Sequence, residues 1–198
     1  MNILIYVDVF CGPTMTFLHR QVTTLSKSNN VTVVCRKEEN KHLYPFPNIK
    51  VIPRTLIDRF RRFVKRKLGI GFNVLNQNFE NEIRKIILDK KINVVLSHFG
   101  PNGIEINNVI VEHNIPHHTI IHGYDGSSLL REKGYLSDLK NTKGINYLFA
   151  SKSMQNNFKN MAGINSGMVV PLGINVQHKP LAKDKSNYFF QAANFVEK

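Results

Sequence analysis

The chain is basic and contains enough apolar residues to fold around a core. It has 198 residues, 42% of them hydrophobic, and a formal net charge of +13. That composition fits one domain or slightly more and excludes disorder over most of the length. No apolar run approaches the roughly 18 residues that are needed to span a bilayer. The excess charge favours an anionic partner: nucleic acid, an acidic membrane surface or a phosphorylated substrate.

The N-terminus and the cysteines predict a cytoplasmic location. The stretch MNILIYVDVF has neither a basic region nor a small-residue cleavage site, so it indicates a first strand and not a signal peptide. The two cysteines, Cys11 and Cys35, are too few for a disulfide framework and indicate a reducing compartment.

The first strand is predicted over residues 3–7, and a short glycine-containing loop follows it. Apolar residues then recur at helical spacing, so a helix should begin at Thr14 or Thr16. In such a unit, backbone N–H groups at the start of the helix can face a phosphate. We therefore name Gly12, Thr14 and Thr16 as candidate substrate-binding residues, although one glycine is a weaker signal than G-x-G-x-x-G.

Strands over 31–35 and 49–52 indicate a doubly wound sheet, and a strongly basic segment follows them. Residues 54–67 carry seven basic side chains and one acidic one. Such an amphipathic helix predicts docking on an anionic membrane surface, and a solvated helix face is the alternative. The sequence does not decide whether Phe60 and Phe63 insert into the bilayer or pack on the core. The candidate membrane-binding residues are Arg59, Arg61, Arg62, Lys65 and Arg66.

A strand–helix–strand unit is predicted in the middle of the chain. Strands over 92–99 and 117–122 flank a helix over 104–113, and a right-handed crossover makes such strands neighbours or near neighbours. The first of these strands closes in a polar loop, HFGPNG. We therefore expect His98 and His122 at corresponding places above the sheet. The candidate substrate-binding residues here are His98 and Gly100.

The loop HGYDGSS after the second strand is the centre of the predicted site. Ligand clefts of open α/β sheets form beyond the carboxyl ends of the strands, which would place His122 and Asp125 in a cleft. In the alternative interpretation, His122 caps the sheet edge and Asp125 caps the next helix. These residues alone do not decide between the two. We name His122 and Asp125 as candidate catalytic residues and Gly123 and Tyr124 as candidate substrate-binding residues.

A metal site is not predicted, although five of the eight histidines lie between His98 and His122. His113 and His117 are four residues apart, but Pro116 interrupts the helix that would align them. No cysteine is close to them in the sequence.

The C-terminal third predicts the end of one domain and the beginning of another. Residues 1–179 form the first domain, and the polar, aperiodic stretch 180–187 is a linker. Residues 188–198 start a new apolar strand that cannot bury itself, so we interpret them as a stub of a second domain. The remaining elements of the first domain are a helix over 129–139, a strand over 145–150, a helix that ends at Gly163 and a strand over 166–174.

Five segments, taken in order, carry a family likeness. They are SHFGPNG, TIIHGYD, YLFAS followed by a helix, VVPLGIN, and a linker leading to a strand that ends in FVEK. This set resembles the N-terminal half of family-four retaining glycosyltransferases, in particular bacterial exopolysaccharide and lipopolysaccharide sugar transferases. A TFL-type segment also follows the first strand in those enzymes, as Thr16-Phe17-Leu18 does here. The resemblance covers almost the whole chain; each motif is modest, and the ordered set is fairly specific.

The resemblance implies one half of a GT-B fold, in which two Rossmann-like domains face each other across a cleft. This half, a doubly wound and mostly parallel sheet flanked by helices, would bind the acceptor, and the other half would bind the nucleotide-sugar. The implied reaction is retaining transfer to a lipid-linked or glycan acceptor, without an obligatory metal ion or other cofactor. His122 would contact the transferred sugar or the acceptor, and the loop from Gly12 to Thr16 would lie near the donor diphosphate. The protein would be peripheral on the inner face of the cytoplasmic membrane, with no nucleic acid partner.

The sequence departs from the family pattern in two ways, and two other functions stay open. Ala193-Asn194 stand where the family typically has Gly-Arg, so a donor-phosphate arginine is missing there. The sequence also stops before the donor loops and paired glutamates of the second domain, so we expect these 198 residues alone to be inactive. The alternatives are a non-catalytic basic module that binds an anionic polymer and another nucleotide-sugar enzyme, such as an epimerase.

Overall fold

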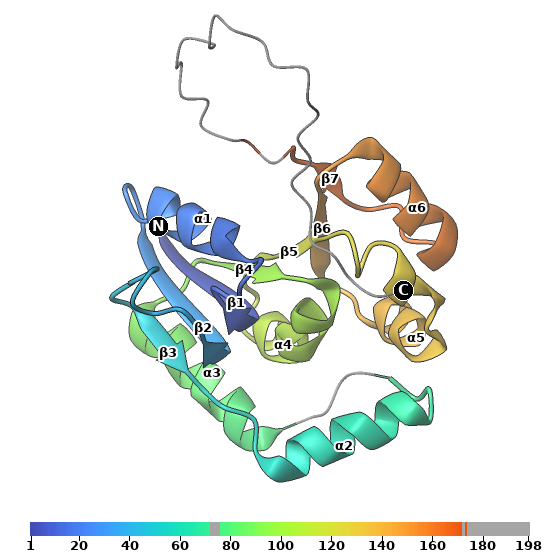
Figure 1. Ribbon diagram of the computed structural model, residues 1–198, viewed down its shortest axis with the longest axis horizontal. Coiled ribbons are helices and arrows are strands. Elements are labelled where there is room, and N and C mark those ends of the chain that lie inside the picture. The colour runs from blue at the N-terminus through green and yellow to red at the C-terminus, as the bar shows by residue number, and fades with distance from the viewer. Residues whose placement is uncertain (72–75, 172, 174–198) are drawn as a thin grey trace, which may run out of the picture.

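Seven parallel strands form the centre of the molecule, with helices on both faces (Figure 1). The computed structural model describes residues 1–71, 76–171 and 173. The strands are β1 (Asn2–Phe10), β2 (Asn30–Glu38), β3 (Ile49–Val51), β4 (Val94–His98), β5 (His117–Ile121), β6 (Ile145–Phe149) and β7 (Met168–Val169). The helices are α1 (Thr16–Leu25), α2 (Leu56–Lys67), α3 (Gln77–Lys90), α4 (Gly100–Glu112), η1 (Ser128–Arg131), α5 (Lys133–Asn141) and α6 (Lys152–Ala162).

The strand order confirms the predicted Rossmann-like α/β fold. The order is β3-β2-β1-β4-β5-β6-β7, and each neighbouring pair is parallel. From β1 the chain winds outward through β2 and β3, and it then returns to place β4 on the other side of β1. This reversal is the topological switch point, where open α/β sheets bind their ligands.

Alternation along β1 gives the two faces of the sheet separate cores. Ile5 faces one side and packs with Leu18 of α1. Leu4 faces the other side and packs with Ile83 of α3 and Val109 of α4. Because a parallel sheet is buried on both faces, its strands are rich in apolar residues, and this made β1 and β4 recognisable in the sequence.

Helix α4 begins earlier than predicted, because the segment GPNG forms its first turn and not a loop. Pro101 is tolerated there, since the first N–H groups of a helix have no partner within the helix. Gly103 is required by close packing: a Cβ atom at this position would lie 2.3 Å from Oγ1 of Thr119 on β5. Gly103, which suggested a turn, therefore allows α4 to pack closely against β5.

Other predicted elements differ in length. The helix predicted over 129–139 is divided into η1 and α5, because the backbone at Glu132 is extended (φ −80°, ψ 115°). The predicted linker 180–187 and the predicted stub 188–198 lie outside the described residues. Among the residues that the structure does describe, no helix combines the length and apolar character needed to cross a membrane.

Helix α2 turns its apolar side toward solvent. Leu56, Phe60 and Phe63 are 81%, 68% and 58% exposed. Asp58, in contrast, is buried and forms a capping box with Thr55 at the start of the helix. Of the two alternatives for the phenylalanines, packing on the core is therefore excluded. The opposite side of the helix faces the body of the domain.

Candidate functional site

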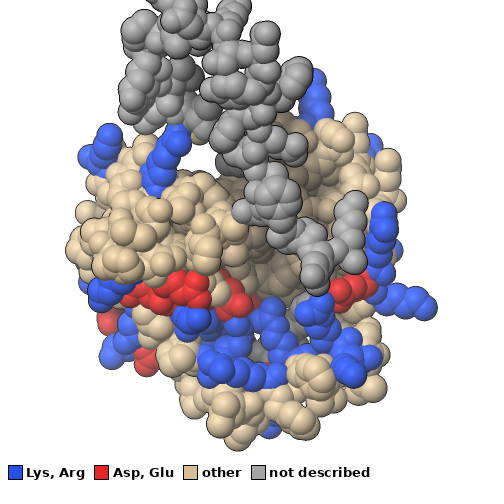
Figure 2. All heavy atoms as spheres, viewed as in Figure 1, with Lys and Arg blue, Asp and Glu red and all other residues tan. Residues whose placement is uncertain are grey.

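Two adjoining cavities lie beyond the carboxyl ends of β1, β4 and β5. Their volumes are about 460 Å³ and about 300 Å³, and both are lined by Asp8, Val9, Arg62 and Arg66. In Figure 2, basic side chains gather around the hollow in the lower half of the view. The position at the switch point and the concave shape make this pair of cavities the candidate ligand site.

The smaller cavity combines apolar walls with a few polar groups. Its lining includes Val7, Met15, Phe99, Asn102, Tyr124 and Leu129. Tyr124 is exposed at this cavity, so its ring is available to a ligand. An apolar cavity with a few placed polar groups is typical of small-molecule sites.

The two histidines of the predicted site come together beside this cavity. Nδ1 of His98 lies 3.3 Å from Nε2 of His122, and the two rings are stacked with centroids 5.5 Å apart. The His122 ring also packs against Phe99, with ring centroids 4.3 Å apart, and against Phe17. This contact places the imidazole next to the wall that Phe99 forms in the cavity.

Both imidazoles are neutral at physiological pH. Burial lowers the pKa of His98 to about 3, and the neighbouring His122 lowers it further. Burial also lowers the pKa of His122 to about 4. Within the described part of the chain, Nδ1 of His122 makes no hydrogen bond, so it can donate to or accept from a ligand.

Asp125 is almost fully buried beneath the loop, at the edge of the smaller cavity that it helps to line. It is 1% exposed, and its carboxylate accepts hydrogen bonds from the backbone N–H groups of Gly100 (2.6 Å) and His122 (2.9 Å). The carboxylate therefore joins the N-terminus of α4 to the end of β5. Burial raises the pKa of Asp125 to about 7, against the opposing effect of these N–H groups. The carboxylate thus holds the start of α4 and the backbone of His122, and not a helix from Gly126 as predicted. Contact with acceptor hydroxyls stays a prediction, and Asp125 lines the smaller cavity where such contact would occur.

Some of the other candidate substrate-binding residues are exposed near the cavities, and others are buried. Gly123 is exposed with open space above its Cα, next to Tyr124. Gly100 is buried: a Cβ atom there would lie 1.8 Å from the hydroxyl of Tyr135. Of the first loop, Gly12 is buried whereas Thr14 and Thr16 are exposed, and none of the three lines either cavity. Met15, which sequence reasoning did not select, lines the smaller cavity in their place.

A buried ion-pair network that sequence reasoning missed forms the floor of the larger cavity. Glu105 of α4 accepts from Arg36 of β2 at 2.7 Å and from Arg54 at 2.8 Å. Arg54 also pairs with Asp8 of β1, and the hydroxyl of Tyr6 donates to Glu105 at 2.7 Å. Arg36 alone gave a signal in the sequence, since it is a cation within an apolar strand.

The network also determines the protonation of Glu105. Burial by itself would raise the pKa of this carboxyl, but Arg54 and Arg36 hold it below its usual value. The carboxylate is therefore ionised at neutral pH, and its charge is shared between the two guanidinium groups.

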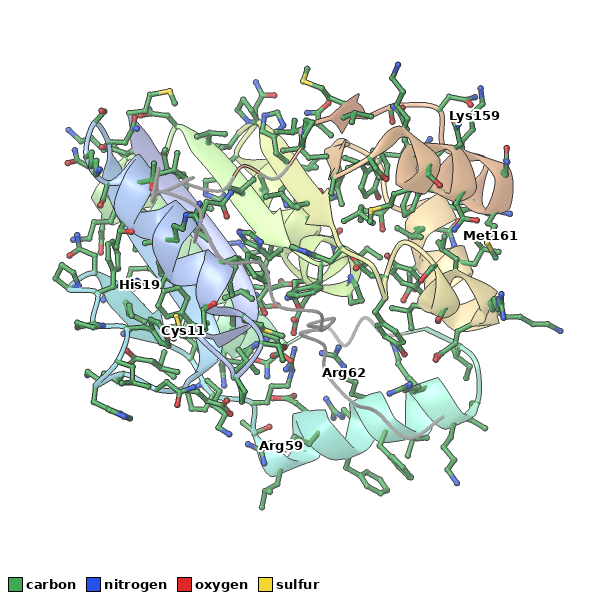
Figure 3. The ribbon with its side chains drawn as sticks, turned by 45° about the horizontal axis from the view of Figure 1, so that its top comes forward. Cys11, His19, Arg59, Arg62, Lys159 and Met161 are labelled. Carbon is green, nitrogen blue, oxygen red and sulfur yellow. The ribbon has the colours of Figure 1, made fainter. Side chains whose placement is uncertain are left out.

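The basic residues of α2 divide between two directions. Arg59, Arg62 and Arg66 line the larger cavity together with Phe63. Figure 3 shows Arg62 reaching from α2 toward the carboxyl ends of the central strands. Three of the five residues predicted to bind a membrane thus face the cavity; Arg61 does not line it.

The described residues contain no group of three or more His, Cys, Asp or Glu side chains that could hold a metal ion. His117, considered above as a ligand, is instead buried between Asn107 and Ser97. Its Nδ1 lies 2.9 Å from Oδ1 of Asn107, and its Nε2 lies 2.8 Å from Oγ of Ser97.

Comparisons with known proteins support the fold at a distance. No protein-family description matches the chain, and no curated protein is significantly similar to it. Among solved structures, the chain is similar to the UDP-N-acetylglucosamine 2-epimerase from Rickettsia bellii, with a TM-score of 0.52 and 9% sequence identity. The match covers 85% of this chain and 44% of the epimerase chain, so the chain spans less than half of that protein's length. The Rossmann-like fold of the chain is consistent with one half of a two-domain GT-B arrangement.

Proposed function

We propose that this chain is the acceptor-binding domain of a retaining glycosyltransferase of the family-four type. The enzyme would move a sugar from a nucleotide-sugar to a lipid-linked or glycan acceptor in surface polysaccharide biosynthesis. The observation that carries the proposal is the neutral imidazole of His122, which lies beside a cavity at the carboxyl ends of β4 and β5. The ordered sequence motifs and the fold shared with a nucleotide-sugar enzyme support the same assignment.

In this proposal His122 hydrogen bonds to the sugar or to the acceptor near the reacting carbon. A neutral imidazole can serve there as donor or acceptor while charge develops on the departing diphosphate. The carboxylate of Asp125 acts as a positioning group, because it fixes the backbone of His122. The nucleotide-sugar would be held mainly by the second domain, as the family resemblance implies.

The proposal is tested by turnover in a two-domain protein, in which residues 1–179 precede a donor-binding domain. Nucleotide-sugars are incubated with a membrane extract, and glycan product is measured. His122→Ala should lower turnover about 100-fold or more, the scale for losing a positioned polar group, with little change in Tm. His42→Ala, which removes an exposed imidazole, is the control and should change neither quantity. If His122→Ala lowers Tm and the remaining folded protein keeps its specific activity, the imidazole is structural.

The same assay separates the alternatives. An epimerase would interconvert nucleotide-sugars without any acceptor, and a binding module would give no turnover with any nucleotide-sugar. The similarity to an epimerase, at 9% identity, concerns the fold and does not favour that reaction.

We also propose that α2 holds the protein on the inner face of the cytoplasmic membrane. Its exposed outer side, with Leu56 and Phe60, fits insertion into the interfacial region of a bilayer, whereas Phe63 lines the larger cavity. Arg61 and Lys67 supply charge for anionic headgroups, at roughly 1 kcal/mol for each basic residue near the surface. Arg59, Arg62 and Arg66 line the larger cavity and are not part of this surface.

Vesicle co-sedimentation tests this surface. Leu56→Glu/Phe60→Glu should abolish binding to vesicles that contain anionic lipid. Leu88→Glu is the control, because it places a charge on an exposed leucine of α3 and should leave binding unchanged. Equal binding by all three proteins would show that the apolar side of α2 is not the docking surface.

A further inference from the structure

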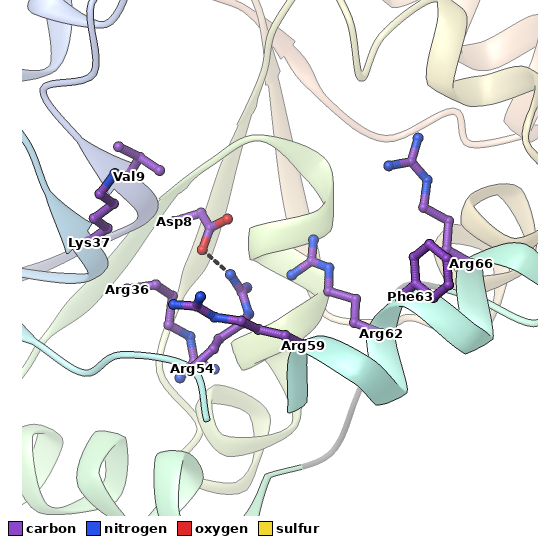
Figure 4. Close-up of a pocket in the computed structure, with 9 residues that line it drawn as sticks. All are labelled: Asp8, Val9, Arg36, Lys37, Arg54, Arg59, Arg62, Phe63 and Arg66. Carbon is purple, nitrogen blue, oxygen red and sulfur yellow. Dashed lines mark hydrogen bonds and ion pairs between the residues drawn. The ribbon is translucent and has the colours of Figure 1, made fainter. Parts of the chain in front are cut away.

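The basic side of α2 forms one wall of the larger cavity. Arg59, Arg62 and Arg66 are separated by three and four residues, so they lie on one side of the helix. Figure 4 shows Arg62 and Arg66 projecting from α2 toward the cavity. The helix therefore presents a row of guanidinium groups to the inside of the domain.

The acidic side chains of the cavity are already paired with other arginines. Asp8 is the acidic residue in the cavity lining, and it pairs with Arg54. Glu105 beneath it pairs with Arg36 and Arg54. Within the part of the chain that the structure describes, Arg59 and Arg62 form no ion pair with a carboxylate. Positive charge at the mouth of the cavity is thus in excess.

Arg62 is half-buried in this setting. Burial lowers the pKa of its guanidinium, and the nearby Arg54 lowers it further. Removal of water from an unpaired cation costs free energy, which an anion bound in the cavity would offset. The site is therefore more favourable when it is occupied by negative charge.

We propose that Arg59 and Arg62 bind the diphosphate group of a lipid-linked acceptor. This inference rests on the proposed glycosyltransferase function and names the chemical class of its acceptor. A diphosphate offers enough oxygen atoms to accept from several guanidinium forks, whereas a carboxylate fills one fork. The cavity volume of about 460 Å³ accommodates such a group, and the adjoining cavity of about 300 Å³ can receive the sugar next to His122.

The two sides of α2 then have complementary parts. The inner side binds the diphosphate through arginines, and the outer side carries the exposed Leu56 and Phe60. The lipid chain of the acceptor can extend from the cavity into the same bilayer on which the outer side rests. This arrangement argues for a lipid-linked diphosphate and against a soluble one.

Calorimetric titration of the 198-residue chain tests the inference with two probes, inorganic pyrophosphate and geranyl diphosphate, at constant ionic strength. Both should bind, geranyl diphosphate more tightly, and acetate at the same concentration should not compete. Arg59→Gln/Arg62→Gln should weaken the binding of both diphosphates by about tenfold or more for each arginine, since a charge-assisted hydrogen bond contributes ~1.5–3 kcal/mol.

The matched control is Lys85→Gln/Arg131→Gln, which removes the same amount of charge from exposed positions outside both cavities. It should bind both probes like the unmodified chain, and Tm should show that every variant is folded. If the control variant binds the two diphosphates as weakly as Arg59→Gln/Arg62→Gln, the loss of affinity comes from net charge alone, and the proposed diphosphate site is wrong. Absence of pyrophosphate binding would also overturn it. Pyrophosphate binding as tight as that of geranyl diphosphate would overturn the lipid-linked assignment.

Failure of this inference can be distinguished from failure of the proposed function. If the two-domain protein transfers no sugar while the arginine-dependent binding of diphosphate persists, the function is wrong and the diphosphate site stands. If sugar is transferred and Arg59→Gln/Arg62→Gln changes neither diphosphate binding nor the KM for the acceptor, the function stands and the diphosphate site is wrong.

Discussion

Two groups of arginines border the same cavity in opposite electrostatic settings. Arg36 and Arg54 lie in the floor, and each is within 2.8 Å of a Glu105 oxygen. Arg59 and Arg62 lie in the wall formed by α2, and among the described residues neither has a carboxylate partner. The first group is buried and compensated; the second is more accessible and uncompensated.

This difference separates arginines that hold the fold from arginines that are available to a ligand. A buried ion pair tolerates the loss of a partner poorly, because the remaining charge stays in a dry environment. An unpaired cation at a cavity contributes little to folding but attracts anions. The comparison therefore predicts that substitutions in the two groups have different consequences for stability and for binding.

The largest effect is expected in the floor. Glu105→Gln keeps the size of the side chain but leaves Arg36 and Arg54 with one less negative charge, so the free energy of unfolding should fall by ~3–5 kcal/mol. Urea denaturation at pH 7.5 measures it. Glu112→Gln is the control, because it breaks an exposed pair with Arg84 on the surface and should change stability little. If Glu105→Gln and Glu112→Gln lower the free energy of unfolding equally, the buried network contributes no more to stability than an exposed ion pair.

A pH titration should separate this network from the buried histidines. Burial lowers the pKa of His117 to about 3, so its protonation favours the unfolded chain as pH falls below about 6.5. At pH 5 this imidazole should cost ~2 kcal/mol relative to pH 7.5. His117→Gln should remove this contribution. The free energy of unfolding of the variant and of the unmodified chain, measured at each pH, gives its size as their difference.

Two carboxyl groups, Asp125 and Glu105, also contribute to the pH dependence of stability. The pKa of Asp125 is raised to about 7, so its ionisation destabilises the fold as pH rises, in the opposite direction to the histidines. The pKa of Glu105 is lowered, so the stability from the network is lost only below its ordinary pKa. Glu105→Gln should therefore leave the slope between pH 7.5 and 5 unchanged. A changed slope would place the titration in the network.

A smaller effect is expected at Tyr6, whose hydroxyl connects Glu105 and Arg36. Tyr6→Phe removes this buried hydroxyl and should cost ~1–2 kcal/mol in urea denaturation, since a partner is left unsatisfied. The affinity for pyrophosphate should not change, because the residue does not line the cavity. A large loss of affinity would show that the floor and the wall act as one unit.

Most strands of the sheet were predictable because burial on both faces makes them rich in apolar residues, as in β1. The meeting of His98 and His122 followed from the same logic, since β4 and β5 are parallel neighbours and end at the same edge. The start of α4 was not predictable from local composition. Pro101 and Gly103 are common in turns, and only the close approach of Thr119 explains them within a helix.

The orientation of α2 relative to the domain could not be predicted from the spacing of its apolar and basic residues. An amphipathic pattern identifies two sides of a helix but does not tell which side faces inward. Just before α2, Arg54 pairs with Asp8 and Glu105, which lie 46 and 51 residues from it in sequence. Contacts over such separations have no signature in a single sequence.

The most direct test of the contrast is the Tm of three proteins, each with and without pyrophosphate: the unmodified chain, Arg54→Gln and Arg62→Gln. Arg54→Gln should melt at a clearly lower temperature, because it removes the ion pairs with Asp8 and Glu105. Arg62→Gln should melt at least as high as the unmodified chain and should lose most of the increase in Tm that pyrophosphate causes. If Arg62→Gln melts as low as Arg54→Gln, or if it keeps the full increase with pyrophosphate, the two groups of arginines do not differ as described.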